Sequence, residues 1–108
     1  MPLELPKPIE AFFAADDGHD TEALAQYFVD AAVVRDEGRT IEGLTAIKEW
    51  RAETKKKYQH TIEPLASAEK NGKTVVTARV AGNFAGSPID LQFVFSVEGA
   101  KIASLEIR

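Results

Sequence analysis

The chain has 108 residues, of which 44% are hydrophobic and 28% charged, and its formal net charge is −4. This length fits one domain with one core, and the composition is that of a folded protein rather than a disordered one. The acidic balance leaves no basic excess for a run of phosphates, so nucleic acid is not an expected partner. Because the sequence has no cysteine, disulfides, thiolate catalysis and Cys-ligated metal centres are excluded.

The first seven residues carry two prolines and an acid, unlike the basic and then apolar layout of a signal peptide. No apolar run approaches the roughly 20 residues that a membrane helix needs. We therefore expect a soluble, cytoplasmic protein with no membrane contact.

Helical spacing of apolar residues predicts two helices in the first quarter of the chain. The first starts at Pro8 and ends near Gly18. Its apolar positions are Ile9, Phe12 and Phe13. The second is capped by Asp20 or Thr21. Its apolar side is formed by Ala23, Leu24, Tyr27 and Phe28.

A short hairpin and the longest helix follow. Residues 32–36 form a short β-branched run, Glu37-Gly38-Arg39 carries a turn signal, and residues 40–42 return beside the first strand. From Leu44 to about Lys57, apolar or bulky side chains recur at helical spacing. This pattern predicts a helix of about four turns.

The second half of the chain is predicted to form strands at residues 59–69, 74–84, 89–97 and 101–107. Asn71-Gly72 is a hairpin signal, and Gly86-Ser87-Pro88 breaks the chain between the middle two strands. Four consecutive strands after three helices indicate the α+β class with an antiparallel sheet.

Strand alternation predicts which side chains face the helices. In the third of these strands the facing positions are Ile89, Leu91, Phe93, Phe95 and Val97. In the strand before it they are Val76, Ala78, Val80, Gly82 and Phe84. The small residues among them leave room for a pocket lined by the sheet, and tight packing against the helices is the alternative.

Four segments carry a family resemblance: residues 18–20 (Gly-His-Asp), 27–36 (Tyr-Phe-Val-Asp-Ala-Ala-Val-Val-Arg-Asp), 41–43 (Ile-Glu-Gly) and 46–50 (Ala-Ile-Lys-Glu-Trp). Together with the element order, they resemble the nuclear-transport-factor-two-like superfamily, particularly its SnoaL-like members, the ketosteroid isomerases and the polyketide cyclases. The resemblance implies a single domain over residues 1–108. Its expected fold is a cystatin-like cone of three N-terminal helices on a curved antiparallel sheet, with a short hairpin between helices two and three. Such a signature bears on fold far more than on activity.

In the ketosteroid isomerases, an acid at the end of the first strand shuttles a proton beside a carbonyl, and Asp36 matches that position. Strand parity puts Asp36 on the same face as Val34. Burial in an apolar cup favours the protonated form of a carboxylate, which can then serve as general base or acid. The alternative is a strand-end carboxylate paired with Arg39 or Arg51.

The isomerases also use two donors for the enolate oxygen, a tyrosine on the first helix and a protonated acid on a late strand. The matching positions here are Phe12 or Ala11 and Leu91, which cannot donate. Asp90 is adjacent but lies on the opposite face by parity. Since losing one such donor typically lowers the rate about 10²- to 10³-fold, we do not expect steroid isomerase activity.

Other candidates lie on or just past the long helix, which covers the mouth of the cone in the family. Trp50 supplies an aromatic wall and one N–H, or is plain core. Arg51 binds an anionic substrate or neutralises Asp36, or reaches solvent along its stem. Tyr58 bonds into the cup or packs under the helix end. His60 suits proton transfer, although a lone histidine at a strand start is more often structural.

His19 lies in the turn between the first two helices, and no third ligand supports a metal site with either histidine. Neither a metal nor another cofactor is expected.

Three functions stay open. The first is a cofactor-independent isomerase, cyclase or hydratase in which Asp36 moves a proton and Tyr58 or His60 assists. The second is a non-catalytic module that holds a small apolar or carbonyl-containing molecule. The residues expected to contact that molecule are Phe13, Val34, Trp50, Arg51, Ala78, Phe84, Leu91 and Phe93. The third is homodimerisation through the sheet, which the resemblance implies. The outer face of the sheet offers Thr77, Arg79, Gln92 and Val94.

Overall fold

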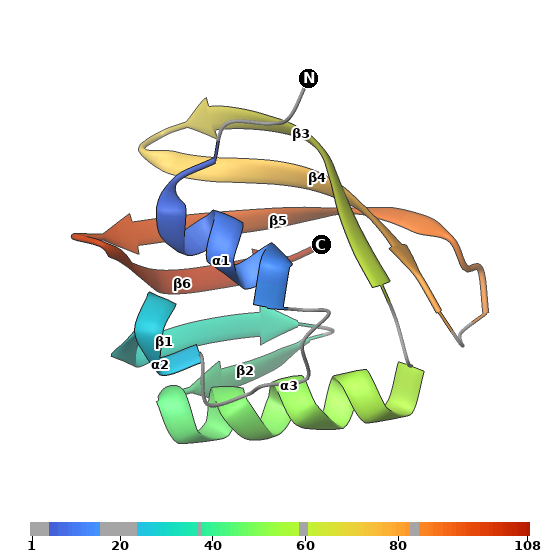
Figure 1. Ribbon diagram of the computed structural model, residues 1–108, viewed down its shortest axis with the longest axis horizontal. Helices are drawn as coiled ribbons and strands as arrows, with labels where there is room; N and C mark the ends of the chain where they lie inside the picture. The colour runs from blue at the N-terminus through green and yellow to red at the C-terminus, as the bar shows by residue number, and fades with distance from the viewer. Residues whose placement is uncertain (1–4, 16–23, 37, 59–60, 83–84) are drawn as a thin grey trace.

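The computed structural model describes residues 5–15, 24–36, 38–58, 61–82 and 85–108, with side chains described in these ranges except at 14–15, 24–25 and 54–58. Figure 1 shows the elements. In chain order they are α1 (Lys7–Ala15), α2 (Leu24–Tyr27), β1 (Phe28–Asp36), β2 (Arg39–Glu42), α3 (Leu44–Tyr58), β3 (Thr61–Lys70), β4 (Lys73–Ala81), β5 (Ile89–Glu98) and β6 (Lys101–Ile107).

The six strands form one sheet in the order β2-β1-β6-β5-β4-β3. Neighbouring strands are antiparallel except β1 and β6, which are parallel. The predicted α+β class is confirmed, but the prediction of a purely antiparallel sheet is wrong at this pair. The pair joins the two halves of the chain, and such a distant pairing leaves no signal in local alternation. The predicted hairpin, β1 and β2, is the edge of the same sheet.

The expectation of three N-terminal helices is also corrected. In the described ranges, α1 and α3 are the helices longer than one turn, and α3 follows the first two strands. Phe28, which helical spacing assigned to the second helix, begins β1 and pairs with Ile102 of β6. Two adjacent apolar residues fit the periodicity of a helix and that of a strand equally well, so the pairing with β6 determines that Phe28 belongs to a strand. No helix in these ranges has both the length and the apolar character of a membrane span.

The core lies between the helices and the concave face of the curved sheet. Figure 1 shows α1 crossing this face in front of β5 and β6, while α3 runs along the β1 and β2 side. At the centre is Phe12, which is fully buried. Its ring makes edge contacts with the rings of Phe13, Phe28 and Phe95, at centroid distances of 5.2, 6.1 and 5.5 Å. Phe93 and Phe95 are both buried on this face, as strand alternation predicts.

Gly43 determines where α3 begins. Its φ of 90° lies in the left-handed region, which glycine adopts at no steric cost. Its N–H donates to the carbonyl of Ala32 at 2.9 Å, and its own carbonyl accepts from the N–H of Ile47 at 3.0 Å. The first turn of α3 is thereby attached to the middle of β1, and the helix is directed along that strand.

We expect Phe12→Ala to lower the free energy of unfolding by about 3–5 kcal/mol, because it empties the centre of the aromatic cluster. The measurement is urea denaturation followed by circular dichroism. Ile89→Ala is the control, since Ile89 is 43% exposed and its truncation should change stability by about 0.5 kcal/mol or less. Equal losses in the two variants would contradict the central role of Phe12.

Candidate functional site

Asp36 and Trp50 meet at the end of β1. Asp36 is the last residue of the strand and lies on its inner face with Val34, while Trp50 comes from the middle of α3. The indole Nε1–H donates to Oδ2 of Asp36 at 3.1 Å. Trp50 is buried and Asp36 half-buried. Among the described residues, Asp36 has no ion pair with Arg39 or Arg51, so the carboxylate is held here by a neutral donor.

Arg51, the next residue of α3, is only 7% exposed, so its side chain does not emerge to solvent. Its Nη2 donates to the carbonyl of Phe12 at 3.4 Å, and its Cζ lies 4.1 Å from the centre of the Phe12 ring. The last four carbonyls of a helix have no intrahelical partner, and the C-terminal end of the helix dipole favours a cation. Arg51 therefore caps α1 at the carbonyl of Phe12 and also stacks on the ring of Phe12.

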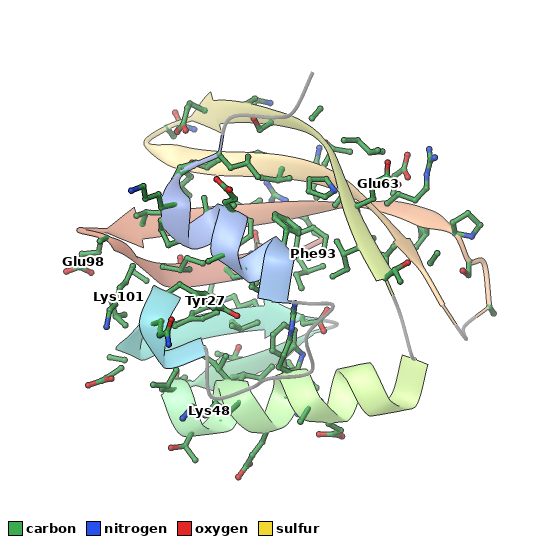
Figure 2. The ribbon with its side chains drawn as sticks, viewed as in Figure 1. Tyr27, Lys48, Glu63, Phe93, Glu98 and Lys101 are labelled. Atoms are coloured by element: carbon green, nitrogen blue, oxygen red, sulfur yellow. The ribbon has the colours of Figure 1, made fainter. Side chains whose placement is uncertain are left out.

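The apolar residues expected at the ligand come together on the inner face of the sheet. Val34, Ala78 and Phe93 are buried in the core, and Leu91 is half-buried against it. The Phe13 ring lies 5.5 Å from that of Phe93, and Figure 2 shows Phe93 beside the C-terminal end of α1. Because Ala78 is fully buried, a bulky residue there would overpack the core rather than simply fill a cavity.

Three of the predicted side chains lie outside the part of the chain that the structure describes. His60 and Phe84 lie outside the described residues, and so does the side chain of Tyr58, whose backbone ends α3. Asp90, which parity assigned to the opposite face, is exposed there and pairs with Arg79 at 3.1 Å. It does not replace the missing acid of the inner face.

The outer face of the sheet carries a hollow of 310 Å³ that was not predicted. Its lining residues are Val33, Arg35, Lys73, Val94, Ser104, Leu105 and Glu106. Ser96 pairs with Ser104 across β5 and β6 next to it, so small side chains leave the depression between larger ones. In the sequence, the alternation of side chains along β1 and β6 already indicated which residues face this side of the sheet. Phe12 was also missed as a partner of Arg51, because a backbone carbonyl has no sequence signature.

The family model for the SnoaL-like domain matches residues 9–105. The chain belongs to this family. Among curated proteins, none matches the sequence.

Solved structures of similar fold include a candidate polyketide cyclase from Sinorhizobium meliloti, 40% identical, with a TM-score of 0.92 over 96% of this chain and 95% of that one. A hypothetical protein from Catenulispora acidiphila with a ketosteroid isomerase-like fold, solved with trimethylamine, is 20% identical, with a TM-score of 0.82 over 97% of this chain and 86% of that one. A nuclear-transport-factor-two-like protein of unknown function from Cytophaga hutchinsonii is 13% identical, with a TM-score of 0.78 over 100% and 91%. The last two show the fold alone.

In this SnoaL-like domain, Arg51→Met should lower the free energy of unfolding by about 1.5–3 kcal/mol, the usual range for a hydrogen bond to a charged group. The methionine keeps much of the apolar stem but cannot cap α1. Arg39→Met is the matched control, because Arg39 is exposed and its replacement should change stability by about 0.5 kcal/mol or less. Urea denaturation measures both. A loss no larger than that of the control would contradict the cap.

Proposed function

We propose that this protein holds a small, mainly apolar molecule with a carbonyl group between its helices and the inner face of the sheet, and that Asp36 transfers a proton beside that carbonyl. The observation that carries the proposal is the half-buried carboxylate on the inner face, held by Trp50 at 3.1 Å. Membership of the SnoaL-like family and similarity to the candidate polyketide cyclase support a small-molecule pocket.

The two hydrogen-bond donors of the isomerases are missing at their matching positions, and their absence narrows the class of substrate. Phe12 and Leu91 offer no hydrogen to a developing oxyanion, and both lie among the described residues. A positioned base alone typically contributes 10²- to 10⁴-fold. We therefore infer a substrate whose C–H is already acidic, because it is flanked by a second carbonyl or by an aromatic ring.

The sheet register supports a length for the proposed ligand. Asp36 pairs with Ile107, and Ile107 pairs with Phe93, so the three lie in one row across β1, β6 and β5. Since neighbouring strands are about 4.8 Å apart, the backbone of Asp36 is roughly 10 Å from that of Phe93. A molecule with its carbonyl at Asp36 and an apolar body toward Phe93 and Leu91 matches this spacing.

The competing proposal is a binding module in which Asp36 only orients the ligand. It uses the same pocket and the same apolar wall. The two differ in one respect: a binder needs a hydrogen-bond acceptor at Asp36, whereas proton transfer needs a group that can take up a proton.

We also propose that a second copy of the chain covers the outer face of the sheet. Val94 is 8% exposed and lines the hollow on the face turned away from α1 and α3. The strands of this face also carry charges of both signs, including the exposed pairs Arg79–Asp90 at 3.1 Å and Arg108–Glu106 at 3.4 Å. The chain as a whole carries −4, so this mixed face is where a second copy, turned by a two-fold axis, meets complementary charge rather than repulsion.

For proton transfer, we expect Asp36→Asn to slow the deuterium exchange of 2-tetralone and 2-indanone by about 100-fold or more, since the amide cannot accept the proton. Both probes are apolar ketones with an acidic C–H, and proton NMR in deuterated buffer follows the exchange. Asp30→Asn is the control, because Asp30 is exposed on the same strand.

Binding is measured separately, by calorimetry with 2-naphthol. Asp36→Asn should keep most of the affinity, whereas Leu91→Trp should reduce it by occupying the apolar end. If wild type, Asp36→Asn and Asp30→Asn all leave the exchange at its background rate while 2-naphthol still binds, the binding module replaces the enzyme.

For the second copy, we expect the wild type to elute as a dimer in size-exclusion chromatography with light scattering, and Val94→Arg to elute as a monomer. Placing a cation in the apolar centre of each copy brings two like charges together at the two-fold axis. Glu53→Arg, an exposed site on α3, is the control and should stay dimeric. A wild type that is monomeric at high concentration would contradict this arrangement.

A further inference from the structure

We propose that Trp50 is the positioning residue of Asp36: its indole N–H occupies Oδ2 and leaves Oδ1 as the oxygen that takes and returns the proton of the ligand. This inference rests on the proton transfer proposed above, and it assigns the two oxygens of one carboxylate to different tasks.

The asymmetry of the contact is the first argument. Trp50 Nε1 lies 3.1 Å from Oδ2, and in the described part of the chain no other group donates to Asp36. An indole N–H is a donor only, so Trp50 cannot take up the proton or pass it on. A donated hydrogen bond withdraws electron density from the oxygen that accepts it. Oδ1 is therefore left as the more available acceptor.

The second argument is that neither partner can easily turn away. Asp36 belongs to a strand that is paired on both sides, with Arg39 of β2 and Ile107 of β6. Trp50 is 4% exposed, and its neighbour Arg51 is attached to the carbonyl and ring of Phe12. The Arg51 Cζ also lies 5.9 Å from the Trp50 ring. Two separately anchored elements thus determine the direction of Oδ1.

The chemical step needs this direction. The C–H bond next to the ligand carbonyl breaks, its electron pair becomes the enolate, and an O–H bond forms at Oδ1. Oδ1 then gives a proton back to a carbon of the enolate, and in deuterated buffer this can be a solvent deuteron that has replaced the first proton on Oδ1. The O–H bond breaks as the C–H or C–D bond forms, so no oxidant is needed. Proton transfer is efficient only when base and carbon are aligned within hydrogen-bond reach, and a misplacement of about 1 Å can lower the rate 100-fold.

A structural role for the hydrogen bond is the competing explanation, because a buried indole N–H needs some acceptor. Removing only that N–H separates the two. Trp50 is the single tryptophan of the chain, so tryptophan can be replaced throughout the protein by its isosteric sulfur analogue, β-(3-benzothienyl)alanine. The ring shape is kept and the donor is lost.

We expect the analogue protein to exchange 2-tetralone roughly 10- to 100-fold more slowly than the wild type. Its affinity for 2-naphthol and its urea midpoint should stay close to those of the wild type. In wild-type protein labelled with ¹⁵N-tryptophan, the single indole signal should move on Asp36→Asn and stay in place on Asp30→Asn.

The outcomes separate the two proposals. Suppose that the wild-type exchange of 2-tetralone depends on Asp36 and that the analogue protein exchanges it just as fast. The positioning role of Trp50 is then overturned, while the proton transfer by Asp36 stands. An indole signal that ignores Asp36→Asn also overturns the positioning role, without any need for activity. If the wild type shows no exchange that depends on Asp36, the proposed function is wrong. The assignment of different roles to Oδ1 and Oδ2 is then wrong as well.

Discussion

The contact between Arg51 and Phe12 is the interaction on which the rest of the structure depends. Phe12 lies at the centre of the aromatic cluster and in the last turn of α1, and Arg51 caps its carbonyl while covering its ring. A helix of nine residues is marginal by itself, so α1 relies on tertiary contacts for its stability. One buried cation satisfies a carbonyl of α1, seals the core and attaches α3 to it.

The same contact determines where the candidate site forms. Successive residues of a helix point about 100° apart, so Trp50 and Arg51 reach different neighbours. Arg51 reaches α1 and Trp50 reaches the end of β1. Gly43 joins the start of α3 to Ala32 of the same strand. The helix is thereby held at its start and at its middle, and Asp36 meets the indole without being part of the core itself.

Much of this could be predicted from the sequence, where the signal is local. Alternation placed Asp36, Phe93 and Asp90 on their correct faces, and β6 has the predicted bounds. The parallel pairing of β1 with β6 could not be predicted, because it joins distant segments. The start of β1 at Phe28 was missed for the same reason, since its apolar neighbours fit either a helix or a strand. The partner of Arg51 was hidden because backbone carbonyls are the same at every position.

The departures from the isomerase pattern have a common physical basis. Phe12 stands where a donor would be expected, and here its ring lies under a guanidinium and against Phe95. A hydroxyl at that position would need a hydrogen-bond partner inside an apolar cluster, at a cost of about 1–3 kcal/mol if it found none. The chain uses the position for packing and helix capping instead. At the end of β1, by contrast, the carboxylate of Asp36 is half-buried and accepts a hydrogen bond from the indole N–H of Trp50, which orients it.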